Sequence, residues 1–259
     1  MKLKMYQIDA FATRVFEGNS AAVIPLASWL SAELMQKIAM ENNPSETVFF
    51  IKEGEVYDIR WFTPVDEVDM CGHATLASAY VLFELLDYSS DEIVFNSKSG
   101  LLKVIKKEHK YEMDFPIQAI EPCEIPQKLL EAFGVTPIKC FHAMDYMLVF
   151  ENEDEVLKAK PKLDLLKELD LRGVIITSKS QKYDFVTRFF APKYGIEEDP
   201  VTGSAFTQLV PFWNEVTHKK SFHAKQVSAR GGEVFCELCE DRVLISGYAV
   251  KYMEAVIEV

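Results

Sequence analysis

Short runs of apolar residues, some alternating with polar ones, recur along the first part of the chain and predict a unit built mostly of strands. Behind Ser31, a residue suited to cap a helix, Leu34 and Ile38 lie at helical spacing and predict a helix to about Glu41. The stretch His73–Leu86 is apolar on nearly every face, which is typical of a fully buried helix. The predicted strands are Leu3–Ala10, Ala21–Leu26, Thr47–Lys52, Val56–Phe62, Glu92–Asn96, Leu101–Lys106 and Lys110–Phe115.

The second part of the chain repeats this order of elements less regularly. Prolines and acidic residues mark Pro116–Pro126 as a linker, and Ile125–Phe133 is predicted to be a helix with Gly134 at its C-cap. Another mostly apolar helix is predicted over Gly203–Val216, and Pro211 inside it is expected to kink it or break a turn. The predicted strands are Tyr146–Phe150, Val174–Thr177, Asp184–Phe190, Gly232–Glu237, Arg242–Ser246 and Ala249–Val259.

One pattern of residues occurs twice, at a constant offset of 128 positions (188 − 60 = 128). The two copies are Arg60–Pro64 followed by Asp69–Thr75, and Arg188–Pro192 followed by Asp199–Ala205. In each copy a strand-like aromatic run ends at proline, and a polar loop leads into an apolar stretch. The sequence therefore predicts an α+β protein of two pseudo-symmetric halves, each a mostly antiparallel sheet with one long buried helix. We expect an N-terminal half over 1–116 and a C-terminal half over 117–259, with the last strand free to pack back on the N-terminal half.

Composition narrows the class of protein. The chain has 259 residues, of which 49% are hydrophobic and 26% charged, as in an ordinary globular protein. Its formal net charge of -12 argues against binding to nucleic acid or an anionic membrane, because both need a basic face. The sequence shows neither a secretory leader pattern nor a run of about 18 apolar residues that could span a bilayer. A cytoplasmic location is expected.

The five cysteines are odd in number and irregularly spaced, which favours free thiols over a disulfide framework. Cys236 and Cys239 have the spacing of a metal-binding pair, but no second pair accompanies them and the residues around them read as a hairpin. No metal site is predicted.

Two predicted helix N-termini are candidate anion sites, because their backbone N–H groups and helix dipole favour negative charge. Gly72 lies at the first, and Gly203 with Ser204 at the second; simple helix capping is the alternative at both. Glu46 stands at the start of a strand of β-branched and aromatic residues. It is either a partly desolvated general base or a solvent-facing loop residue.

Cys71 and His73 lie one residue apart at the first of these N-termini, where a thiol pKa is depressed and a histidine can exchange protons near neutrality. A catalytic thiol and a buried structural cysteine are both open. Asp199 occupies the position that mirrors Cys71 and either caps its helix or faces a ligand. Arg230, in a glycine-rich segment, either contacts a substrate carboxylate or belongs to an ordinary turn.

Several motifs in order resemble the phenazine-biosynthesis PhzF-like isomerase family, over nearly the whole chain. They are Ile8–Phe11, Gly18–Val23, Ser45–Phe49, Arg60–Pro64, Cys71–Thr75, Asp199–Ala205 and Arg230–Gly232. The resemblance implies the diaminopimelate epimerase-like fold, in which each half is a curved sheet wrapped around a long central helix. Pro44 and Val227 depart from the residues that are more usual in the family.

The resemblance also implies roles for individual residues. Glu46 would shuttle a proton, as the matching glutamate of PhzF does on a cyclohexadiene amino acid, while His73 and Asp199 would bind and polarise the substrate. Ser45, Gly72 and Ser204 would hold the substrate carboxylate, and the neighbouring Gly203 and Arg230 are further candidates for binding it. The related epimerases use one cysteine from each half. Here only Cys71 is present, and Asp199 mirrors it, so a two-thiol racemase is disfavoured.

These observations predict a cofactor-independent isomerase that moves a proton within a small carboxylate-bearing metabolite, with no cofactor and with a homodimer as the expected assembly. Two alternatives stay open. One is a thiol hydrolase or acyl transferase that uses Cys71 and His73. The other is a protein that binds a metabolite without converting it.

Overall fold

The computed structural model describes all 259 residues, and they form two compact units. Unit 1 contains residues 1–114 and 246–259, and unit 2 contains residues 115–245. The boundary therefore lies two residues before the predicted one, between 116 and 117. The final strand belongs to unit 1 rather than to the second half of the chain. None of the helices combines the length and the apolar character needed to cross a membrane.

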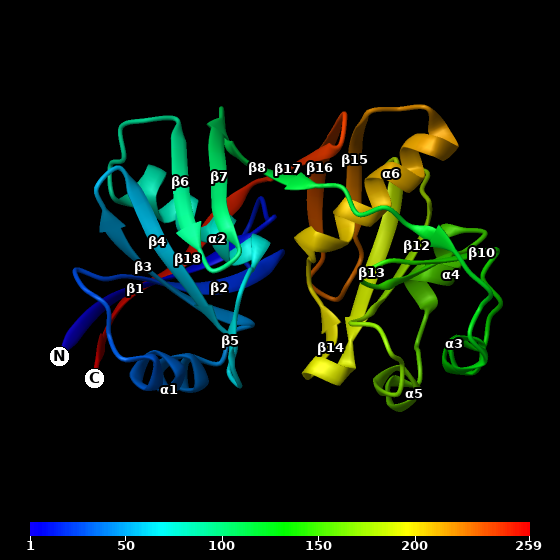
Figure 1. Cartoon of the computed structure of the whole chain (residues 1–259), viewed down its shortest axis with the longest axis horizontal. Helices are drawn as coiled ribbons and strands as arrows, with labels where there is room; N and C mark the ends of the chain where they lie inside the picture. Colours follow the sequence, from blue (N-terminus) through cyan, green and yellow to red (C-terminus); the bar gives the residue numbers. More distant parts are fainter. The chain divides into compact units, whose positions relative to one another are not determined.

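Unit 1 is a curved sheet in the order β18-β1-β2-β3-β4-β6-β7-β8 (Figure 1). Only the β2–β3 and β4–β6 pairs are parallel, so the sheet is mostly antiparallel, as predicted. Its strands are β1 (Lys2–Ala10), β2 (Asn19–Pro25), β3 (Glu46–Glu53), β4 (Val56–Phe62), β5 (Glu67–Val68), β6 (Glu92–Ser97), β7 (Gly100–Lys107), β8 (Lys110–Pro116) and β18 (Ala249–Glu258).

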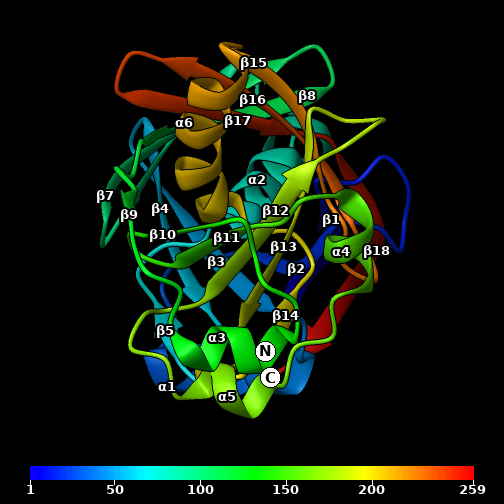
Figure 2. The same cartoon turned by 90° about the vertical axis from the view of Figure 1, so that its right-hand side faces the viewer.

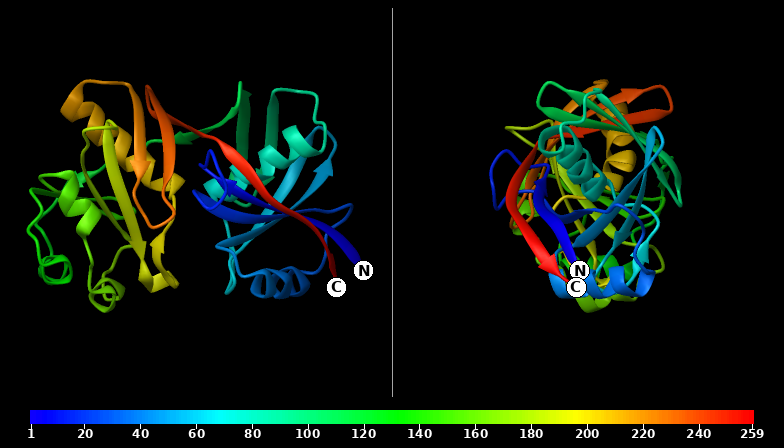
Figure 3. Two further views of the ribbon diagram at one scale, coloured as in Figure 1. Left: turned by 180° about the vertical axis from the view of Figure 1, so that it is seen from behind. Right: turned by 90° about the vertical axis from the view of Figure 1, so that its left-hand side faces the viewer.

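The two ends of the chain meet in unit 1. β18 runs antiparallel to β1 from Lys2 opposite Glu258 to Ala10 opposite Ala249, and both termini lie together at one end of this pair (Figure 3). Hydrogen bonding between strands so distant in sequence explains why the last strand joins the first unit.

Two helical segments accompany this sheet. α1 (Ala32–Asn42) begins at the predicted cap, where the Ser31 hydroxyl accepts a hydrogen bond from the Leu34 N–H at 3.2 Å. α2 (Gly72–Tyr80) packs against β1, β2, β3 and β18, and every residue from His73 to Ala79 is buried. The predicted long buried helix is confirmed, although its last part, η1 (Val81–Leu85), is wound as a π-helix.

Unit 2 repeats the pairing pattern of unit 1. Antiparallel and parallel pairs alternate along the strand order β10-β11-β12-β13-β15-β16, just as they do along β1-β2-β3-β4-β6-β7 in unit 1. This confirms the α+β fold of two pseudo-symmetric halves that the repeat predicted. The remaining strands are β9 (Glu121–Pro122), β10 (Lys139–His142), β11 (Tyr146–Val149), β12 (Val174–Lys179), β13 (Phe185–Ala191), β14 (Ile196–Asp199), β15 (Ser221–Gln226), β16 (Gly232–Cys239) and β17 (Arg242–Gly247).

The helices of unit 2 include two that the sequence analysis missed. α3 (Gln127–Phe133) ends at Gly134, whose left-handed backbone confirms the predicted C-cap. The missed helices are α4 (Glu153–Lys158) and α5 (Leu163–Lys167), and α5 lies beside α3 (Figure 2). Asn152 and Glu155 form a capping box at α4, a signal that was present in the sequence.

The helix that corresponds to α2 begins with the 3₁₀ turn η3 (Gly203–Ala205) and continues as α6 (Phe206–Thr217). A further 3₁₀ turn, η2 (Pro192–Tyr194), follows β13. Of the two effects expected of Pro211, a kink or a broken turn, the broken turn is absent, because α6 runs through Pro211 without interruption. Proline leaves the carbonyl four residues earlier without its helical partner. The N–H of Gln118 donates to this carbonyl of Thr207 at 3.1 Å, so the expected linker is docked on unit 2.

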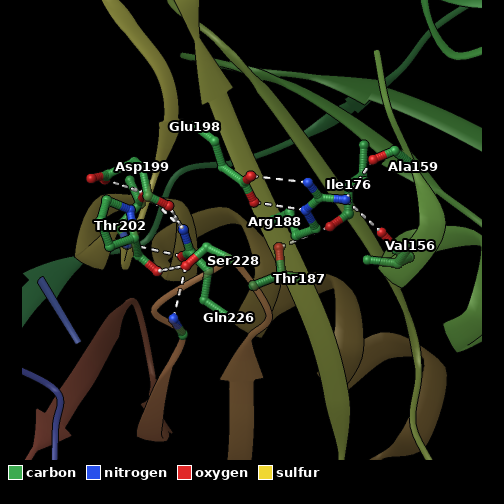
Figure 4. A network of polar contacts seen from close by, with 12 residues as sticks. Val156, Ala159, Ile176, Thr187, Arg188, Glu198, Asp199, Thr202, Gln226 and Ser228 are labelled. Atoms are coloured by element: carbon green, nitrogen blue, oxygen red, sulfur yellow. Dashed lines mark hydrogen bonds and ion pairs between the residues drawn. The ribbon is translucent and has the colours of Figure 1, made fainter. Parts of the chain in front are cut away.

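The arginine of the repeated motif has the same task in both units. Arg60 forms a two-pronged ion pair with Glu67, and Arg188 forms one with Glu198 (Figure 4). Each guanidinium also lies over the phenylalanine two residues later, 5.3 Å from the ring centre of Phe62 and 5.0 Å from that of Phe190. The arginine and aromatic part of the repeat is therefore structural, since it ties β4 to β5 in unit 1 and β13 to β14 in unit 2.

Candidate active site

The end of α1 determines where Glu46 lies. Asn43, in the left-handed conformation at φ 55°, terminates the helix and turns the chain toward β3, of which Glu46 is the first residue. Parallel pairing with β2 sets Glu46 opposite Ala21. Glu46 is only 8% exposed, so the solvent-facing alternative is wrong and the carboxylate lies in a desolvated position.

The N-terminus of α2 brings two more candidates together. Cys71 is the N-cap residue, with an extended backbone that makes no side-chain cap, and His73 is the second residue of the helix. The Thr75 hydroxyl donates to the Cys71 carbonyl at 2.6 Å and holds this turn in place. Both Cys71 and His73 are buried.

Glu46, Cys71 and His73 form one compact group. His73 Nε2 lies 2.9 Å from Glu46 Oε2, and His73 Nδ1 lies 3.4 Å from Cys71 Sγ. The Nε2 and Oε2 atoms face each other as an ion pair, yet both are fully buried and neither makes an aligned hydrogen bond. Leaving buried polar atoms without hydrogen bonds is costly, so the hydrogen-bonding capacity of this pair is not used within the protein.

Asn19 is a member of the site that the sequence analysis did not single out. Its side chain is fully buried, and Nδ2 lies 3.3 Å from His73 Nδ1. The Ser45 hydroxyl donates to Asn19 Oδ1 at 3.0 Å, so Ser45 is joined to His73 through this amide. An amide nitrogen only donates, so this contact is a hydrogen bond when the ring is neutral with its proton on Nε2, facing Glu46. Asn19 follows Gly18 in one of the motifs of the resemblance, and that was the available signal.

The protonation of this group differs from the expectation for Cys71. Burial and then the charge of Glu46 raise the pKa of the Cys71 thiol, and the opposing effects of His73 and of the Ala74 N–H do not offset them. The predicted depression of this pKa is wrong, and the thiol is protonated at neutral pH. Burial disfavours a charged His73, but Cys71 and Glu46 beside the ring more than compensate. Because Cys71 is neutral, we attribute the raised pKa of His73 chiefly to Glu46.

The same three side chains are the one group in the structure with the composition of a metal site, and their ligand atoms lie within 4.8 Å of one another. Cys71 and Glu46, however, address opposite nitrogens of the imidazole. A single ion binds a histidine through one nitrogen. The arrangement therefore fits a hydrogen-bonded relay better than a three-ligand metal centre.

The candidates in the second half of the chain lie in unit 2 and form their own network. The side chain of Asp199 is 2.5 Å from the Thr202 hydroxyl, and Gln226 donates to the Asp199 carbonyl at 2.7 Å (Figure 4). Gln226 also accepts from the Thr202 N–H at 2.9 Å. Both sides of the fully buried Gln226 amide thus hold the loop before η3, a role that sequence reasoning missed.

Ser204 and Gly203 begin the 3₁₀ turn η3. The Ser204 hydroxyl accepts a hydrogen bond from Arg172 at 3.0 Å, and Arg172 forms a two-pronged pair with the fully buried Asp145. Gln208 donates to the same carboxylate. Ser204 therefore already has an internal partner, which the sequence analysis did not anticipate.

Arg230 lies on the turn between β15 and β16. The Ser228 hydroxyl donates to the Pro200 carbonyl at 2.8 Å and accepts from the Gly231 N–H at 2.9 Å. Gly231 has a φ of 63°, in the left-handed region that favours glycine. These bonds fix the turn that carries Arg230 beside the loop of Asp199.

The chain is similar to known proteins over its full length. It is 47% identical over 251 residues to an uncharacterized isomerase of Pseudomonas aeruginosa, with 96% of each chain covered. It is 37% identical to a human phenazine biosynthesis-like domain-containing protein, covering 98% of each chain. A crystal structure of a PhzF-family phenazine biosynthesis protein from Enterococcus faecalis matches with a TM-score of 0.98 at 44% identity, over the whole of both chains.

The family model described as phenazine biosynthesis-like protein matches residues 8–255, which is nearly all of the sequence. This span includes every motif on which the resemblance was based. The chain belongs to the phenazine biosynthesis-like (PhzC-PhzF) family.

Proposed function

We propose that this protein is a cofactor-independent isomerase that moves a proton within a small carboxylate-bearing metabolite, with Glu46 as the acid and base. Relatives that are close to half identical carry the name isomerase, which supports the reaction class. The observation that carries the proposal is the buried, unaligned pair of Glu46 and His73.

Glu46 has the properties that a proton shuttle needs. In its ionised form it accepts a proton from a substrate carbon, and the electron pair of the broken C–H bond moves into the conjugated system. Neutral Glu46 then returns the proton to another carbon, so atoms and charge balance without an external acid. His73, with Nε2 at 2.9 Å, stabilises the carboxylate when it is charged.

The start of α2 offers a place for a substrate carboxylate. The first N–H groups of a helix have no partner within the helix, and its dipole favours an anion there. The Cys71 side chain does not cap these groups, and Gly72, the first residue of the helix, has no side chain to cover them. We therefore assign Gly72, with the hydroxyl of Ser45, to carboxylate binding.

The polar group of unit 2 is proposed to bind substrate as well, through Asp199, Gly203, Ser204 and Arg230. Asp199→Asn keeps the size of the side chain and removes its charge. We expect the variant to raise KM or lower kcat while leaving the thermal unfolding midpoint within a few degrees of that of the parent. Unchanged kinetics would remove Asp199 from the proposal.

Deuterium incorporation tests the proposal directly. Small amino and hydroxy acids are incubated with the protein in D2O, and NMR identifies any compound that gains solvent deuterium. Glu46→Gln is expected to lower incorporation about 100-fold or more, the usual contribution of a general acid or base. Glu53→Gln, at the exposed far end of the same strand, is the matched control and should exchange like the parent. Full activity of Glu46→Gln would overturn the assignment.

A thiol enzyme is the second candidate, because Cys71 lies 3.4 Å from a histidine nitrogen. The raised pKa of the buried thiol argues against it. Cys71→Ala should retain deuterium incorporation if Glu46 is the base, and it should lose all activity if Cys71 is a nucleophile. Tight retention of a ligand without incorporation by the parent protein would instead indicate a metabolite-binding protein.

A further inference from the structure

Two cysteines outside the candidate active site lie directly opposite each other in unit 2, Cys123 just after β9 and Cys140 in β10. β9 and β10 pair with Pro122 opposite Phe141, so the next residues in register are Cys123 and Cys140. The Cys123 N–H donates to the Cys140 carbonyl at 3.0 Å, which continues the pairing. The two sulfur atoms are 3.2 Å apart, and both cysteines are free thiols.

This geometry is close to that of a disulfide. Residues that are directly opposite in an antiparallel pair have Cα atoms about 4.5 to 5.5 Å apart, inside the range that disulfides span. The sulfurs need to approach by only about 1.2 Å to reach bonding distance. Small changes of two side-chain rotamers suffice, because the strands already hold the backbone in register.

We propose that Cys123 and Cys140 form a modification site, at which a peroxide closes an intramolecular disulfide. Cys123 is partly exposed and reacts first: its thiolate takes one oxygen from hydrogen peroxide and becomes a sulfenic acid, and hydroxide leaves. The sulfur of Cys140 then attacks the sulfenic sulfur, and water leaves. Overall, two thiols are oxidised and one peroxide is reduced to two waters.

The two thiols are suited to these different parts. Burial, together with the contact from Cys123, raises the pKa of Cys140, so this cysteine remains a thiol until its neighbour is activated. Cys140 is 4% exposed, which shields it from direct attack by oxidant. A partly exposed cysteine with a buried resolving partner in contact favours the disulfide over further oxidation of Cys123.

The Cys123–Cys140 disulfide would attach the first residues of unit 2 covalently to β10. This segment is already held by hydrogen bonds from the N–H of Ile117 to the Asp241 carbonyl and from that of Gln118 to the Thr207 carbonyl. A disulfide between residues 17 positions apart closes a loop that contains α3 and reduces the freedom of the unfolded chain. We therefore expect oxidation to stabilise unit 2.

The test treats the full-length protein with hydrogen peroxide, blocks remaining thiols with iodoacetamide and digests it without reductant for mass spectrometry. The expected product is a peptide pair joined through Cys123 and Cys140, with two hydrogen atoms fewer than the reduced pair, and dithiothreitol should separate it. Thermal unfolding of the oxidised protein should shift upward by about 5 °C and return on reduction.

Matched variants separate this site from general oxidation. Cys140→Ser should give neither the joined peptide nor the thermal shift, whereas Cys239→Ser, at the other partly exposed cysteine, should give both. Sulfinic acid at Cys123 beside an alkylated Cys140 would overturn the proposal. So would a joined peptide from any other pair of cysteines with Cys123 left free.

Discussion

The arginines of the repeat allow one prediction to be worked out in depth, because the two copies provide their own control. Arg188→Met removes a guanidinium and keeps an apolar stem of similar length. In the structure this guanidinium makes two bonds to Glu198, at 2.7 and 2.9 Å, and its third nitrogen donates to two carbonyls at the end of α4. Those carbonyls belong to Val156 and Ala159, at 3.0 and 2.7 Å (Figure 4).

The expected cost follows from what the substitution leaves behind. The side chain of Arg188 is 12% exposed and that of Glu198 is 24% exposed, so the carboxylate loses its partner in a largely desolvated place. Breaking such a pair costs about 3 to 5 kcal/mol. We expect about 4 kcal/mol for Arg188→Met, including the loss of the bonds to α4.

Arg60→Met is the matched substitution in unit 1. Arg60 makes the same two-pronged pair, but Glu67 has a second partner in Lys98 at 3.0 Å, and no helix carbonyl depends on Arg60. The remaining lysine keeps the carboxylate paired, so we expect a smaller loss of about 2 kcal/mol.

Urea unfolding followed by circular dichroism measures both losses, and a difference of about 2 kcal/mol corresponds to about 1 M in midpoint for a unit of this size. Hydrogen exchange adds a local readout, since the amides of α4 should exchange faster in Arg188→Met and not in Arg60→Met. Equal losses in the two variants, or unchanged exchange in α4, would refute the reasoning.

Three further predictions concern a glycine, a histidine and metal ions. Gly18→Ala should strongly lower the free energy of unfolding, because Gly18 has a φ of 66° and a Cβ there would lie 2.1 Å from the Ala10 carbonyl oxygen. In a urea titration the control Gly54→Ala, with a φ of 61° but open space around the added Cβ, should lose only about 1 kcal/mol of this free energy. Because the pKa of His73 is raised in the folded protein, the protonated ring contributes to the free energy of unfolding. This contribution is fully present below about pH 6.5, the pKa of an unfolded histidine, and is lost as the pH rises through the higher pKa of the folded protein. Urea midpoints of His73→Gln should lack this loss, and parallel pH curves would contradict it. Dialysis against a chelator should leave deuterium incorporation unchanged, and a loss restored by zinc would indicate that Glu46, Cys71 and His73 bind metal.

Local signals in the sequence account for much of the fold. Ser31 and Gly134 end their helices as expected because capping depends on a few neighbouring backbone groups. Strand ends were predicted well where polar turns separate apolar runs. The short helices α4 and α5 were missed, since each has only five or six residues and contributes only one buried residue, too short a stretch to show a helical period.

The candidate site was predicted less completely. Glu46, Cys71 and His73 were predicted from the residues, and the structure brings these three together. Asn19 lies 54 positions from His73, and no pattern among neighbouring residues predicts a side-chain contact over that distance. The direction of the Cys71 pKa was wrong because it depends on burial and on a carboxylate from another strand.

The sequence by itself determined the family, the internal repeat and the residues able to exchange a proton, because these depend on the identity and spacing of side chains. Only the tertiary structure decided that the last strand pairs with the first, that the Thr207 carbonyl freed by Pro211 accepts a bond from Gln118, and that Cys123 meets Cys140. The physical reason is the same in each case. Hydrogen bonding, desolvation and contact between residues far apart in the chain depend on packing, and one sequence read along its length does not contain those distances.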